Sequence, residues 1–110
     1  MAVALALVAG CTRPTHDQAV LKAINGEAQN LMASQPAETP VRVPKNRWPR
    51  GIAGLNPEGV TIFSSGVDIK VKAEFDDDWG YFVPRNELES PEPRERFSAI
   101  GQGVYWYVPY

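Results

Sequence analysis

Residues 60–72 read VTIFSSGVDIKVK, and this stretch decides the fold. Successive side chains of a β-strand point to opposite faces of its sheet, so the alternation of apolar and charged residues over positions 67–72 predicts a half-buried strand. A second strand over residues 60–63 precedes it, and the short turn at residues 64–66 makes the two an antiparallel hairpin. We expect one set of side chains in the core, Val67, Ile69 and Val71, and the other in water, Asp68, Lys70 and Lys72.

Two further strands are predicted over residues 79–83 and 104–108, which are aromatic and β-branched runs that each end directly before a proline. A tight acidic turn at residues 76–78 joins the second strand to the third. Residues 84–96 are rich in proline and glutamate, which favours a long exposed loop. We expect residues 97–100 to form a short helical turn before the last strand.

Before the strands, residues 15–34 have the period of an amphipathic helix. Thr15 and Gln18 match a capping box at its start, and Pro36 stops it, because the residue before a proline is disfavoured in the helical conformation. Gly26 in the middle of the helix costs about 1 kcal/mol relative to alanine. The predicted apolar face consists of Val20, Leu21, Ile24, Ala28, Leu31 and Met32.

These elements predict an α+β fold with one N-terminal amphipathic helix and a small antiparallel sheet of about four strands in a meander. A strongly twisted sheet that curls into a small barrel is the alternative. We expect residues 1–10 to be a signal peptide, residues 11–35 an N-terminal segment with the helix, residues 36–50 a proline-rich basic linker, and residues 51–110 a small β-rich domain. The helix and the linker would hold that domain away from a membrane.

The composition excludes several classes of protein. The 110 residues are 44% hydrophobic, with a net charge of −2, one cysteine and one histidine. The sequence contains no run of about 18 apolar residues, which excludes a polytopic membrane protein. A single cysteine cannot form an internal disulfide framework. The mild acidity lacks the basic stripe of a nucleic-acid-binding domain, so no nucleic-acid partner is expected.

The first ten residues, MAVALALVAG, form an apolar run that ends in small residues directly before Cys11. This pattern is typical of a signal peptide and its cleavage site. Because the run is short and contains no lysine or arginine, we expect the signal peptide to be incomplete at its N-terminus. The alternative is a cytosolic protein with an apolar N-terminus and an unrelated cysteine.

Val8-Ala9-Gly10-Cys11 resembles the lipobox of bacterial lipoproteins. The resemblance implies cleavage between Gly10 and Cys11, and a mature chain that begins at Cys11 with a thioether-linked diacylglyceryl group and an acylated amine such as a palmitoyl amide. In a Gram-negative host, Thr12 after the cysteine would favour the periplasmic face of the outer membrane. Several acyl chains on one residue hold a protein firmly on a bilayer, whereas one chain does not.

The residues give little sign of catalysis, so we predict no catalytic residue and no cofactor. His16, the single histidine, lies at the start of the helix, which leaves the usual Ser-His-Asp and Cys-His arrangements without a base near the sheet. Three consecutive acids at residues 76–78 lack the alternate spacing of a calcium loop, and Gly101-Gln102-Gly103 lacks the setting of a phosphate loop, so no metal is expected. A small hydrolase would require a pocket with converging aspartate, glutamate and tyrosine side chains.

Binding is the function that remains. Tyrosine is enriched at protein interfaces, and alternation places Tyr105 and Tyr107 on the face opposite Trp106. Either the helix covers that tyrosine face or an aromatic patch is exposed there. The candidate binding residues are Asp76, Asp77, Asp78, Tyr81, Tyr105 and Tyr107.

Charge is segregated along the chain. Residues 41–50 have a net charge of +4 and contain no acidic residue. Residues 74–95 contain eight acidic residues and two arginines, which gives a net charge of −6. The basic segment is either a solvated spacer or attracted to anionic lipid headgroups. The acidic region either steers a basic partner, or pairs with the basic segment and keeps the protein soluble.

We therefore expect a non-catalytic, lipid-anchored protein of the cell envelope, attached through Cys11, whose β-rich domain binds another protein or an envelope component. An inhibitor or immunity-type protein is one form of this hypothesis. The alternative is a structural accessory subunit of an envelope complex, and a small hydrolase is the third.

Overall fold

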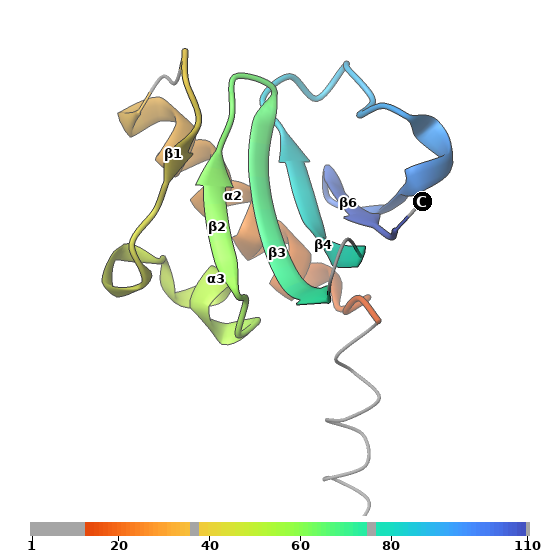
Figure 1. Ribbon diagram of the computed structural model, residues 1–110, viewed down its shortest axis with the longest axis horizontal. Coiled ribbons are helices and arrows are strands. Elements are labelled where there is room, and N and C mark those ends of the chain that lie inside the picture. The colour runs from red at the N-terminus through yellow and green to blue at the C-terminus, as the bar shows by residue number, and fades with distance from the viewer. Residues whose placement is uncertain (1–12, 36–37, 75–76, 110) are drawn as a thin grey trace, which may run out of the picture.

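The computed structural model describes residues 13–35, 38–74 and 77–109 (Figure 1). The described residues form an antiparallel sheet of six strands, with the helix α2 (Gln18–Ser34) across one face and the short helix α3 (Arg50–Gly54) near one edge. The predicted α+β fold with an antiparallel sheet is confirmed, but the sheet has six strands rather than about four. Gly10, Cys11 and Asp76, which carry sequence predictions, lie outside the described residues.

The four predicted strands are neighbours in the sheet in the predicted order, and two further strands lie at its edges. The strand order is β1-β2-β3-β4-β6-β5. The strands are β1 (Val41–Arg42), β2 (Gly59–Ile62), β3 (Gly66–Glu74), β4 (Asp77–Pro84), β5 (Phe97–Gly101) and β6 (Val104–Tyr107).

One added strand, β1, comes from the segment expected as a linker. Val41 and Arg42 pair with Ile62 and Thr61 of β2, and the chain continues through a 3-10 turn at Lys45–Arg47 into α3. The carboxylate of Glu27 on α2 accepts hydrogen bonds from the first amides of α3, at 2.9 Å from Gly51 N and 2.8 Å from Ile52 N. The basic segment is therefore joined to the sheet and to α2 rather than extended between them.

The other added strand, β5, replaces the helical turn expected at residues 97–100, and that prediction was wrong. β5 and β6 form a hairpin in which Phe97 lies opposite Tyr107. Gly101 and Gly103 have φ angles of 119° and 74°, values that glycine adopts without steric cost, and they allow the tight turn. The short helical turn occurs earlier, as a 3-10 turn at Arg94–Arg96.

Helix α2 has the predicted apolar face but a different cap. Asp17, not Thr15, is the N-cap residue, and its carboxylate accepts hydrogen bonds from the amides of Ala19 and Val20. Gln18 makes no capping box, because its side-chain amide donates to Ile100 O at 3.2 Å. The helix ends two residues before Pro36, as predicted, and buries Leu21, Ile24, Ala28 and Met32 against the sheet.

The core lies between α2 and one face of the sheet. Val67 and Ile69 are fully buried there as predicted, and the rings of Tyr81 and Trp106 meet edge to face at 5.0 Å. A β-bulge between Lys70 and Lys72 shifts the register of β3, and Lys72 pairs with Trp79 of β4. The bulge interrupts the regular alternation that would place Lys72 on the same face as Asp68 and Lys70. The remaining buried core residues come from the sheet, from α3 and from the segment between β1 and α3: Val43, Ile52, Val60, Ile62, Val83 and Val104.

Candidate functional site

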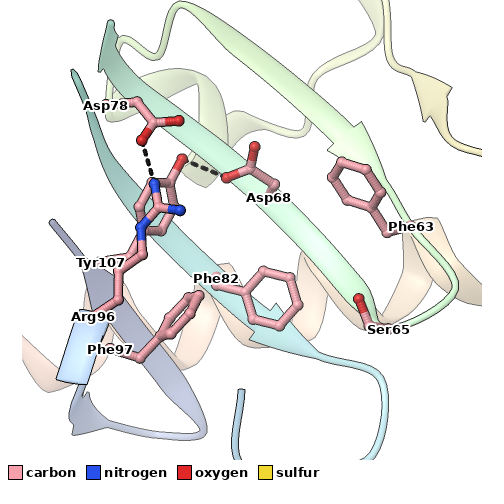
Figure 2. A pocket seen from close by; sticks show the side chains of 8 residues that line it. All are labelled: Phe63, Ser65, Asp68, Asp78, Phe82, Arg96, Phe97 and Tyr107. Atoms are coloured by element: carbon pink, nitrogen blue, oxygen red, sulfur yellow. Dashed lines mark hydrogen bonds and ion pairs between the residues drawn. The ribbon is translucent and has the colours of Figure 1, made fainter. Parts of the chain in front are cut away.

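The sheet face opposite α2 carries a pocket of about 260 Å³, shown in Figure 2. Helix α2 lies behind the sheet in that view, so the pocket and the core occupy opposite faces. Eight residues from the hairpin β2–β3, from β4 and from the C-terminal strands line it, and we call them the sheet pocket: Phe63, Ser65, Asp68, Asp78, Phe82, Arg96, Phe97 and Tyr107.

The strand register brings these residues together. Asp68 on β3 lies directly opposite Phe82 on β4, and Tyr107 on β6 lies opposite Gly80 on β4. A Cβ atom at position 80 would stand 2.7 Å from the hydroxyl oxygen of Tyr107. Because glycine has no side chain, the ring of Tyr107 reaches across β4 to Asp68 on the next strand.

The hydroxyl of Tyr107 donates a hydrogen bond of 2.5 Å to Asp68 Oδ1. Burial raises the pKa of Tyr107, and the negative charge of Asp68 raises it further, so the phenol remains a donor at neutral pH. Burial also raises the pKa of Asp68, and the hydrogen bond from Tyr107 and the charge of Lys70 only partly oppose this effect. Asp68 is therefore a carboxylate whose ionised form is poorly solvated.

The second carboxylate of the pocket has a different environment. Asp78 forms an ion pair with the guanidinium of Arg96 and lies 3.7 Å from Lys70 Nζ. The same guanidinium lies 4.9 Å from the ring centroid of Tyr107, a geometry that favours a cation–π contact. Within the described residues Asp78 has two cationic partners, whereas Asp68 has no ion pair.

Aromatic rings form the apolar part of the pocket. Phe82 and Phe97 meet edge to face with centroids 5.8 Å apart, and Phe97 lies at the same distance from the ring of Tyr107. Phe63 stands across the pocket, on the side of the β2–β3 hairpin, and both Phe82 and Asp68 lie between the two sides (Figure 2). The three phenylalanines are only half-buried, so their rings are available to a ligand.

The structure brings two of the sequence-predicted binding residues, Asp78 and Tyr107, into this pocket. Tyr105 is half-buried on the same face, opposite Phe82, but does not line the pocket. Tyr81 lies in the core on the α2 side, where its hydroxyl accepts a hydrogen bond from Thr15 N at 2.9 Å. Asp77 is the first residue of β4.

The sequence left open whether the helix covers the face of Tyr105 and Tyr107. It does not, because α2 packs on the opposite face, which carries Trp106. Nor is that face a simple exposed patch, because Tyr107 is only 3% exposed.

Sequence reasoning missed Asp68, Arg96 and the three phenylalanines. Asp68 was placed in water by its alternation, and nothing local to the sequence indicates that a tyrosine 39 positions later bonds to it. The available signal was Gly80, because a glycine between aromatic residues inside a strand often marks a close approach of another group.

Comparison with protein-family models, with curated proteins and with solved structures finds no match for this chain.

Two further observations bear on the class of site. Among the described residues, no helix has the length and apolarity needed to cross a membrane. In the same part of the chain, no three histidine, cysteine or acidic side chains are grouped closely enough to bind a metal ion.

The pocket does bring together aspartate and tyrosine side chains, an arrangement that the sequence analysis associated with a hydrolase. Asp78, however, is engaged by Arg96 and by Lys70, and one oxygen of Asp68 is engaged by a buried phenol. His16 is exposed at the start of α2, on the other layer of the fold.

Proposed function

We propose that this protein is a non-catalytic, lipid-anchored protein of the bacterial cell envelope that binds another protein or an envelope component through the sheet pocket. The observation that carries the binding function is the pocket itself, which presents half-exposed rings and, in Asp68, a carboxylate without an ion pair among the described residues, on the face opposite α2. Aromatic anchors beside charged groups are typical of protein-binding surfaces. The lipobox-like Val8-Ala9-Gly10-Cys11 supports the anchor.

The fold begins close to the proposed anchor. Arg13 follows Cys11 by two residues, which span at most about 7 Å, and Thr15 is already hydrogen-bonded to Tyr81 in the core. The first described residues lie at the end of the sheet where β3 leads into β4 (Figure 1). A lipidated Cys11 would therefore hold the domain near the bilayer, instead of at the distance that a helical spacer would give.

A structural accessory subunit of an envelope complex is the second candidate. Leu88, in the segment between β4 and β5, is 93% exposed. A single exposed leucine is ordinary on a protein surface, and in such a complex it would become a contact residue. Cross-linking would then join the 85–96 segment, rather than the sheet pocket, to a stable complex.

The anchor is tested by labelling with radioactive palmitate. We expect the wild-type chain to become labelled and the Cys11→Ala variant to remain unlabelled. An unlabelled wild-type chain, expressed behind a complete signal peptide in a lipoprotein-processing host, would contradict the lipid anchor.

The binding face is tested by a photo-crosslinking amino acid in place of Ser65, which is exposed at the pocket. Ala53 is exposed on α3, away from the pocket residues, and provides the matched control position. We expect a specific adduct in intact envelopes from position 65 and none from position 53. Equal adducts from both positions, or none from either, would count against binding through the pocket.

A further inference from the structure

We propose that the sheet pocket binds a lysine side chain of the partner polypeptide, with the ammonium group at Asp68 and the alkyl stem against the phenylalanine rings. This inference rests on the proposed binding function and specifies the chemistry that the pocket recognises.

The first step is the charge of Asp68. Its only hydrogen-bond partner among the described residues is the neutral hydroxyl of Tyr107, and Lys70, two residues along the strand, contacts Asp78 instead. A carboxylate that is partly removed from water without a cationic partner is costly to the fold. A perturbed carboxylate of this kind in a pocket is a candidate binding group, and a cation from outside would supply its missing partner.

The second step distinguishes ammonium from guanidinium. Tyr107 already donates to Asp68 Oδ1, so Oδ2 is the carboxylate oxygen left without a hydrogen bond among the described residues. Arginine pairs best with a carboxylate when both oxygens accept its parallel N–H groups. Lysine carries a compact point charge that needs one acceptor, so a carboxylate with one oxygen already engaged favours lysine.

The third step is the fit of the alkyl stem. Phe63, Phe82 and Phe97 are half-buried around the pocket, and a lysine stem packs its methylene groups on apolar surface while its charge reaches a polar group. An ammonium near the ring faces gains a cation–π attraction in addition. Arg96, a cation that lines the pocket, forms its ion pair with Asp78 and lies over the ring of Tyr107, so its charge acts on Asp68 only from a distance.

The surroundings favour the same class of partner. The segment of residues 74–95, which contains the pocket residues Asp78 and Phe82, carries a net charge of −6, and a net negative charge accelerates encounters with basic partners at long range. A lysine presented on a basic surface therefore matches both the pocket and the net charge of this segment.

The test is a titration of the 110-residue chain with Nα-acetyl-lysine amide, followed by the NMR shifts of the backbone amides. Nα-acetyl-norleucine amide keeps an unbranched four-carbon side chain without the charge, and Nα-acetyl-arginine amide supplies the other cation. We expect shifts centred on residues 63–68, 82, 97 and 107, with the lysine probe bound about tenfold more tightly than the norleucine probe. The arginine probe should bind more weakly than the lysine probe.

Two variants with equal net charge locate the site. Asp68→Asn should weaken lysine binding about tenfold, whereas Glu87→Gln, in an exposed segment away from the pocket, should leave it unchanged. Tyr107→Phe frees the second oxygen of Asp68, so it should raise the affinity for the arginine probe relative to the lysine probe. This reversal of preference does not depend on the behaviour of Asp68→Asn.

Three results would overturn the inference: no shifts at the pocket, equal binding of the norleucine probe, or equal loss in the two charge-matched variants. If Ser65 still cross-links a partner in the envelope while the lysine probe fails, the binding function stands and the lysine specificity falls. If the probe binds but position 65 yields no adduct, the pocket recognises lysine and the proposed cellular function falls.

Discussion

At the scale of single residues, the negative charge of Asp68 is partly buried and contributes little to the stability of the fold. The pKa of Asp68 is raised by burial. Between the ordinary pKa of about 3.9 and the raised value, the folded protein therefore keeps a proton that the unfolded chain has released. Retention of such a group in a pocket is expected where binding, rather than stability, benefits from it.

This leads to a prediction on pH dependence. As pH rises from the ordinary pKa of Asp68 to its raised folded pKa, the folded state binds more protons than the unfolded state, so the contribution of Asp68 to stability falls. Asp68→Asn cannot ionise and should lose less stability than the wild type over this range. Thermal unfolding midpoints at pH about 4 and about 7 measure the difference.

The comparison isolates Asp68, because the charged and titratable groups that face it remain in both proteins: Lys70, Asp78, Arg96 and Tyr107. Glu87→Gln serves as the control and should follow the wild type. A parallel loss of stability in Asp68→Asn and in the wild type would show that Asp68 ionises in the fold without penalty.

Gly80 determines whether Tyr107 reaches Asp68. A methyl group at this position would stand 2.7 Å from the Tyr107 hydroxyl and also press on the backbone oxygen of Ile69. Gly80→Ala should therefore lower the free energy of unfolding by about 1–3 kcal/mol and displace the tyrosine ring from Asp68. Urea unfolding gives the first quantity, and loss of lysine-probe binding reports the second.

The matched control for this prediction is Gly54→Ala, because nothing lies within 4 Å of a Cβ built at position 54. Its stability should stay within about 0.5 kcal/mol of the wild type. If Gly80→Ala behaves like Gly54→Ala, the glycine is not required for the approach of Tyr107.

At the scale of elements, α2 contains a helix-breaking residue that no tertiary contact requires. Gly26 lies in the middle of the helix, and a Cβ built there meets nothing within 4 Å. Gly26→Ala should raise the free energy of unfolding by about 0.5–1 kcal/mol, because alanine loses less backbone entropy in a helix. Urea unfolding measures this gain, and an unchanged or lowered stability would mean that the glycine relieves a strain in α2.

The elements that the sequence predicts are those with a clear hydrophobic period. The buried face of α2 and the alternation of β3 each extend over several residues, long enough for a period to be recognised. β1 has two residues, too few for any period, and it exists because Val43 N donates to Val60 O at the sheet edge. The sequence of β5 predicts a helical turn, and the strand is missed because it forms by pairing with β6 rather than through a pattern in its own residues.

The site was less predictable than the elements for a related reason. Tyr107 and Asp78 were among the expected binding residues, because tyrosines and acids are recognisable by type. Asp68 and Arg96 acquire their roles only through register: Asp68 by the reach of Tyr107 across Gly80, and Arg96 by its ion pair with Asp78. Such contacts join positions far apart in the chain and leave no local pattern.

At the scale of the whole molecule, α2 and the sheet share one core, with consequences for how the protein unfolds. Leu21, Ile24 and Ala28 are each 0% exposed against the sheet residues Val67 and Ile69. The helix therefore depends on the sheet for burial of its apolar face, and the sheet depends on the helix. Within the described residues, α2 and the sheet therefore share one core.

We accordingly predict a single cooperative unfolding transition. Ile24→Ala should lower the free energy of unfolding by about 2–5 kcal/mol, because it leaves a cavity in the shared core. The helical circular dichroism signal and the tryptophan fluorescence should shift to lower urea together, since coincident probes are the mark of two-state unfolding. Lys22→Ala, which changes an exposed residue of the same helix, should move neither by more than about 0.5 kcal/mol. Loss of the helical signal before the tryptophan signal in Ile24→Ala would mean that the sheet is stable without α2.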